Sequence, residues 1–201
     1  MIEFDNTNKQ ILSQACLTCK DEYFQPPINN MPKVGCCSYS PTFYLYEIAQ
    51  MCRRDEQFFF QNILAHPTAE ISPFSIKIHA NTHPAYSQAV ANNKQTLSKI
   101  EEDDLRLSYS TCQFFKKEEG CTLHPSFKNS VCRSFICLSI ENSLTEKKKQ
   151  TLLKWTKLIK NEEMTFQRVH EHELKQKDLT LLSNPIEVVH YFQQLQNLST
   201  T

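Results

Sequence analysis

The chain has 201 residues and no net formal charge at pH 7, because 22 basic side chains balance 22 acidic ones. This balance gives no net field that would hold nucleic acid or an anionic membrane, so neither is an expected partner. An apolar fraction of 40% is typical of a globular protein, and the length predicts one compact domain over residues 1–201. Glycine occurs only twice, where about fourteen would be average. The sequence therefore excludes glycine-rich phosphate loops, dinucleotide fingerprints and the G-x-S-x-G nucleophile elbow.

The start of the chain bears on its compartment. Its first ten residues include acidic side chains and no apolar h-region, and the longest strictly apolar run is about as short as the phenylalanines at 58–60. We therefore expect neither a signal peptide nor a membrane span. The expected compartment is the cytoplasm, where thiols stay reduced.

Apolar periodicity predicts a mainly α fold. Residues 42–66 have apolar side chains near helical spacing and are predicted to form a helix that stops at Pro67. A proline-rich connection over 67–84 follows, with one short strand around Ile76. Residues 85–107 predict a surface helix with a thin apolar stripe.

The second half of the chain divides into two parts. Residues 109–140 carry aromatic and β-branched residues, which predict short strands and turns in a small irregular cysteine-rich centre. Residues 143–198 are predicted as a C-terminal helical segment. In it, an S-x-x-E capping box at Ser143 precedes a long helix to about Lys177, and a last helix starts at Pro185.

Two smaller features of the helical segment are predicted to face solvent. The strongest basic patch, the three lysines at 147–149, is small and is interpreted as a solvated face. His170 and His172 stand two residues apart on the long helix, so they do not share a face, and both are expected to be hydrated.

Nine cysteines are the main chemical signal of the chain, and in a reducing compartment such a set indicates metal binding rather than disulfides. They form an early group and a late group. Cys52 lies in the middle of a predicted helix and is interpreted as a core thiol. The predicted metal ligands are the other eight, namely Cys16, Cys19, Cys36, Cys37, Cys112, Cys121, Cys132 and Cys137.

The local spacing of these cysteines constrains the kind of site. The C-x-x-C of Cys16 and Cys19 brings two thiolates within reach of one ion, whereas the vicinal pair at 36–37 rarely supplies two ligands to one tetrahedral site. We therefore expect that pair to serve different metals or different corners of a cluster. Both glycines, Gly35 and Gly120, directly precede a cysteine, where positive φ would direct backbone N–H groups at sulfur.

Two polar residues beside the cysteines have two interpretations each. Arg133, next to Cys132, could neutralise clustered thiolates or could be a surface charge. His124, three residues after Cys121, could complete a Cys₃His site or could belong to an ordinary turn. Zinc ribbons and both common ferredoxin spacings do not match the cysteine pattern.

Taken together, these motifs resemble the YkgJ-type cysteine-cluster family, the CxxCxxCC zinc- or iron-chelating domain, to which flagellin lysine-N-methylases are distantly similar. The resemblance covers roughly residues 16–137, with a longer interval between Cys19 and Cys36 than in that family and with His124 in place of a usual tyrosine. The positions that carry it are Cys16, Cys19, Cys36, Cys37, Cys112, Phe114, Gly120, Cys121, Leu123, Cys132, Arg133 and Phe135.

The expected function is therefore metal binding. The two cysteine groups would form a thiolate-ligated centre holding zinc or iron, a 4Fe–4S cluster included, with its biochemical role left open. The resemblance implies one alternative, an S-adenosylmethionine-dependent enzyme similar to the protein lysine N-methylases. A second alternative is a protein-interaction module in which the metal only staples the fold and the helix at 143–177 docks a protein partner.

Overall fold

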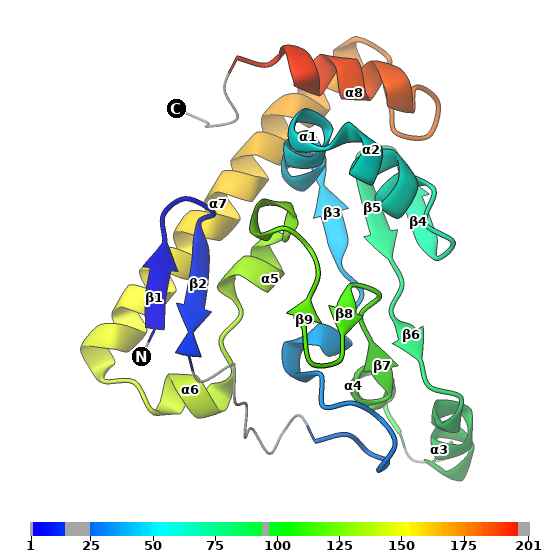
Figure 1. The fold of residues 1–201 in the computed structure, drawn as a ribbon, viewed down its shortest axis with the longest axis vertical. Helices are drawn as coiled ribbons and strands as arrows, with labels where there is room; N and C mark the ends of the chain where they lie inside the picture. The colour runs from blue at the N-terminus through cyan, green and yellow to red at the C-terminus, as the bar shows by residue number, and fades with distance from the viewer. Residues whose placement is uncertain (1, 15–24, 94–96, 197–201) are drawn as a thin grey trace.

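The computed structural model describes residues 2–14, 25–93 and 97–196, and its fold is mainly helical with small antiparallel sheets (Figure 1). The strands are β1 (Ile2–Asp5), β2 (Gln10–Ser13), β3 (Thr42–Tyr44), β4 (Ala69–Ser72), β5 (Ser75–Ile78), β6 (Asn81–Thr82), β7 (Ser110–Thr111), β8 (Phe115–Lys116) and β9 (Gly120–Cys121). The α-helices are α1 (Leu45–Arg54), α2 (Glu56–Phe58), α3 (Ala85–Asn93), α4 (Lys99–Ser108), α5 (Ser130–Ser134), α6 (Leu138–Asn142), α7 (Glu146–Gln176) and α8 (Pro185–Gln194). A π-helix (Phe59–Leu64) and 3₁₀ turns at Gly35–Ser38 and Pro125–Phe127 complete the described elements.

The largest core lies where α1 and α8 pack on the three-stranded sheet β3–β5–β4 and on the C-terminal half of α7. Helix α1 is buried along most of its length, and its Ile48 and Met51 are fully enclosed. Helix α8 adds Val188 and Phe192, both fully buried. Burial of such side chains stabilises the fold by about 1.5–3 kcal/mol each, so these contacts fix the positions of α1 and α7.

A second, smaller core lies under the hairpin β1–β2, which runs along the N-terminal half of α7 (Figure 1). Ile2 and Ile11 of the hairpin pack against Leu152 and Ile159 of α7. The ring of Phe4 stacks on Trp155 with centroids 5.3 Å apart. Helix α7 therefore carries both cores on one continuous face.

The helix predicted over 42–66 is interrupted at both ends. It begins only at Leu45, because Thr42–Tyr44 pairs with β5 as a strand. It breaks at Asp55, whose carboxylate accepts the backbone N–H of Phe58 at 2.8 Å and so starts a new short helix. The chain then continues as a π-helix to Leu64.

The proline-rich connection over 67–84 is a sheet rather than a loop. The strand predicted around Ile76 is present as β5, but β4 and β3 pair on either side of it. Ile76 and Ile78 are fully buried, and β5 contacts the π-helix, so this segment belongs to the main core.

The helix predicted over 85–107 is split into α3 and α4, the second starting at a capping box of Ser98 and Glu101. The short strands predicted over 109–140 are present as β7, β8 and β9. The same segment also contains α5 and α6, which the sequence did not predict.

The long helix and the last helix are confirmed as α7 and α8, but the predicted capping box is wrong. Helix α7 begins after Thr145, and the hydroxyl of Ser143 donates to the carbonyl of Ile140 at 2.6 Å instead. The prediction of a hydrated His170 is also wrong. It is buried between Phe166 and Phe192, and its Nδ1 lies 2.5 Å from the Tyr191 hydroxyl.

In the ranges that the structure describes, no helix combines the length and the apolar character that a bilayer crossing requires.

Candidate metal centre

Five of the predicted metal ligands line one cavity of about 620 Å³. The thiols come from four separate parts of the chain: the 3₁₀ turn Gly35–Ser38, the residue after β7, strand β9 and helix α5. They are Cys36, Cys37, Cys112, Cys121 and Cys132. Helix α5 lies between the hairpins β1–β2 and β8–β9 in Figure 1, and apolar side chains of β2 and α5 form much of the remaining wall.

Backbone contacts hold two of these segments together. The N–H of Cys112 donates to the carbonyl of Cys37 at 2.6 Å, which ties the end of β7 to the 3₁₀ turn. In the same region, Thr122 donates its N–H to the carbonyl of Phe114 at 2.8 Å and closes the hairpin that carries Cys121. The cavity wall is thus fixed by short main-chain contacts between residues distant in sequence.

Both glycines have the backbone conformation that the sequence indicated. Gly35 has φ of 54° and Gly120 has φ of 80°, a region that residues with a Cβ rarely adopt. A Cβ at either position would meet no atom within 4 Å, so the requirement for glycine comes from φ alone. Each glycine sets the direction of the chain immediately before a cysteine of the cavity.

The thiols shift one another's pKa through hydrogen bonds and through charge. The Cys37 thiol hydrogen-bonds to Cys36 and lowers the pKa of Cys36 to about 7, while the pKa of Cys37 rises strongly. Burial raises the pKa of Cys112 to about 11 and that of Cys132 to about 12. The charge of a Cys121 thiolate further raises the pKa of Cys37, Cys112 and Cys132, as expected for thiols around one space.

Three predicted ligands are not among the cysteines that line this cavity. Cys137 is half-buried, immediately precedes α6 and is not part of the cavity wall. Cys16 and Cys19 lie outside the described residues, although Gln14, the last residue described before them, lines the cavity. Cys52 is 2% exposed inside α1, which confirms its interpretation as a core thiol.

His124 and Arg133 have partners other than the cysteines. The Nδ1 of His124 accepts the N–H of Ser126 at 3.2 Å and contacts its hydroxyl at 2.7 Å, so the imidazole caps a 3₁₀ turn. Arg133 is 1% exposed, which excludes its interpretation as a surface charge. Its guanidinium contacts Glu47 at 3.3 Å and lies 5.0 Å from the ring centre of Tyr46.

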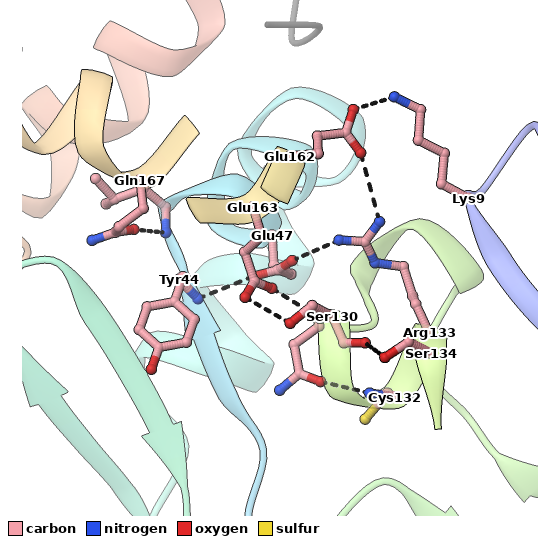
Figure 2. A network of polar contacts seen from close by, with 12 residues as sticks. Lys9, Tyr44, Glu47, Ser130, Cys132, Arg133, Ser134, Glu162, Glu163 and Gln167 are labelled. Atoms are coloured by element: carbon pink, nitrogen blue, oxygen red, sulfur yellow. Dashed lines mark hydrogen bonds and ion pairs between the residues drawn. The ribbon is translucent and has the colours of Figure 1, made fainter. Parts of the chain in front are cut away.

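The environment of Arg133 is a buried polar network that the sequence did not indicate (Figure 2). Glu47 of α1 contacts the guanidinium, Glu163 of α7 lies beside Glu47, and both oxygens of Glu163 accept from Ser130 of α5. A polar residue within an amphipathic helix usually faces solvent, so the pattern alone predicts exposure for Glu47 and Glu163. Only the packing of α1 against α7 places these carboxyl groups inside.

The five thiols line the cavity without converging on one point. Across residues 2–14, 25–93 and 97–196, no group of three or more histidine, cysteine, aspartate or glutamate side chains is arranged to hold a metal ion. Comparisons with models of known protein families, with curated proteins and with solved structures find no match. The resemblance to the YkgJ-type family stays a prediction.

Proposed function

We propose that the protein binds zinc or iron through thiolates of the cavity that Cys36, Cys37, Cys112, Cys121 and Cys132 line. The observation that supports this proposal most is the gathering of five cysteines from four chain segments at one cavity. Thiols that served only as small core residues would be distributed like Cys52, which lies in the main core and lines no such space.

The donor set fits soft or borderline metals. Thiolate ligands suit zinc and iron–sulfur clusters, whereas magnesium and calcium prefer oxygen ligands. Because the thiols surround the cavity without converging, binding requires small movements of the 3₁₀ turn, β9 and α5 toward one another. Such coupling of ligand movement to metal binding is usual for metal sites that form on binding. Proton release from the buried thiols accompanies it, so binding weakens as pH falls.

The role of the two cysteines at 16 and 19 belongs to the same proposal. With Gln14 on the cavity wall, the chain leaves β2 at the cavity itself. We therefore keep Cys16 and Cys19 among the proposed ligands, in a protein of the cytoplasm or another reducing compartment.

The test is purification under anaerobic conditions, followed by metal analysis and a visible spectrum of the full chain. A colourless protein with stoichiometric zinc would support a thiolate centre. Iron with acid-labile sulfide and broad absorption at about 400 nm would also support one. Cys36→Ser, Cys132→Ser and the double variant C16S/C19S are each expected to lose at least about half of the metal.

Cys52→Ala is the matched control, because it removes a cysteine that lies outside the cavity. It should keep the metal content of the wild type. The proposal is wrong if the wild-type protein carries no metal after growth with zinc and iron, or if Cys36→Ser and Cys132→Ser both retain full occupancy.

A further inference from the structure

The buried polar network of Figure 2 brings three carboxyl groups to one place in the interior. Glu47 is fully buried, Glu163 is 7% exposed, and the side chain of Glu162 is 9% exposed. Two cations face them: Arg133 contacts Glu47 at 3.3 Å and Glu162 at 4.0 Å, and Lys9 pairs with the other oxygen of Glu162. The titratable groups around the network are Tyr39, Tyr46 and Glu47 from the first half of the chain, Arg133 from α5, Glu162 and Glu163 from α7, and Lys9 from the β1–β2 turn.

The charges of this network do not balance if every carboxyl group is ionised. Three carboxylates against two cations would leave one uncompensated negative charge in the interior, which is strongly unfavourable. One proton removes this imbalance. Burial and the adjacent Glu163 raise the pKa of Glu47 well above its usual range, and Arg133 offsets this only in part. The carboxyl group of Glu47 is also hydrogen-bonded to that of Glu163, so Glu163 accepts the proton that Glu47 carries.

The network also determines where α5 lies. Glu163 accepts the N–H of Ser130 at 2.9 Å and its hydroxyl at 2.7 Å, so it holds the first residue of the helix. Glu47 holds Arg133 near the other end. Between these two anchors is Cys132, whose thiol belongs to the cavity wall. The helix has only five residues, so it has little stability apart from these contacts.

We propose that Glu47 holds a proton inside this network, beside Glu163, and that loss of this proton to solvent loosens α5 and moves Cys132 away from the cavity wall. Without the proton, two adjacent carboxylates repel each other, and the anchors at Ser130 and Arg133 are pulled apart. The consequence for metal rests on the proposed function: alkaline conditions weaken the hold of Cys132 on a bound ion, and this opposes the usual gain from thiol ionisation.

The experiment uses amide hydrogen exchange of residues 130–134 in the metal-free protein, corrected for the intrinsic effect of pH. In the wild type, protection should fall at least about tenfold, or about 1.4 kcal/mol, between about pH 6 and about pH 9. Glu47→Gln mimics the protonated carboxyl group and should reduce this loss to less than about twofold. Glu187→Gln, an exposed residue of α8 outside the network, should behave like the wild type.

The inference is overturned if the wild type shows no pH-dependent loss of protection, or if Glu47→Gln loses as much as the wild type. Carbon-13 spectra of the glutamate carboxyl groups in the wild type provide a second measurement, independent of how the variant folds. They should show a protonated Glu47 at the lower pH of the exchange experiment, and an ionised Glu47 there would also overturn it.

Zinc affinity, measured by chelator competition, then tests the consequence for metal. At about pH 6, Glu47→Gln and the wild type should bind zinc with about equal affinity. At about pH 9, the variant should bind zinc about tenfold more tightly than the wild type. A ratio that does not change with pH contradicts the coupling to the cavity. Because the exchange and carbon-13 measurements need no metal, a protein that binds none would refute the proposed function and leave the proton inference testable.

Discussion

At the level of single residues, the two glycines connect sequence and structure most directly. Their scarcity and their position before Cys36 and Cys121 predicted turns with positive φ, and both turns have it. This prediction succeeded because the requirement is local: one backbone angle excludes almost every other residue type. That these turns direct N–H groups at sulfur stays a prediction.

Gly120→Ala should lower the free energy of unfolding by about 1–2 kcal/mol, because alanine is strained at this φ. Its Cβ meets no atom within 4 Å, so no steric clash adds to the strain. Gly120→Asn is the matched control, since asparagine tolerates the left-handed region and should lose distinctly less. Urea denaturation measures both. Equal stability of Gly120→Ala and the wild type would show that the β8–β9 turn relaxes without cost.

Arg133 shows where residue-level prediction failed. The sequence places it beside Cys132, and adjacency suggested either a thiolate partner or a surface charge. The structure instead directs its guanidinium to Glu47, which is 86 residues away in sequence. Nothing in the local pattern indicates such a partner, because ion pairs between distant elements depend on how those elements pack.

At the level of elements, the sequence predicted best the helices that have a long periodic pattern of apolar residues. The long apolar stripe of α7 was predicted to within a residue of its C-terminal end, and α8 was predicted from its starting proline. Helices α5 and α6 have five residues each, too few to show a period. Helix α5 depends instead on its side-chain contacts, among them a cap in which Asn129 accepts the N–H of Cys132 at 2.9 Å.

The break between α1 and α2 provides a test at this scale. Asp55 ends α1 because its backbone leaves the helical region, with φ of −157° and ψ of 79°, and its carboxylate caps α2 at Phe58. Asp55→Ala removes the cap and should lower the free energy of unfolding by about 1 kcal/mol. Asp55→Asn keeps a capping oxygen and should lose only a few tenths of that. Thermal denaturation compares the two, and an equal loss in both variants would contradict a capping role.

At the level of the whole molecule, α7 joins the two cores. Its first half packs under the hairpin β1–β2 through Leu152 and Ile159, and its second half packs into the main core through Phe166 and Leu174. The sequence predicted the helix but not this division, because both halves show the same apolar spacing. The first half is covered by the hairpin β1–β2, more than a hundred residues earlier in the chain, and the second by α1 together with α8, which follows α7.

Charge is also distributed unevenly over the molecule, although its net value is zero. The first half of α7 has six lysines between residues 147 and 160 and no acidic residue there. Among the ion pairs of the described residues, none includes one of these lysines. This region should therefore have a positive potential that the net charge does not reveal.

The protein should bind a sulfonate cation exchanger at low ionic strength near pH 7, because a local cluster of cations interacts with the resin more strongly than dispersed charges do. Replacing the exposed Lys154, Lys157 and Lys160 with glutamine should shift elution to clearly lower salt. The matched control replaces three exposed lysines outside the first half of α7, Lys99, Lys117 and Lys177, and changes the net charge by the same amount. If both triple variants elute together, net charge alone governs binding, and the half-helix provides no distinct positive surface.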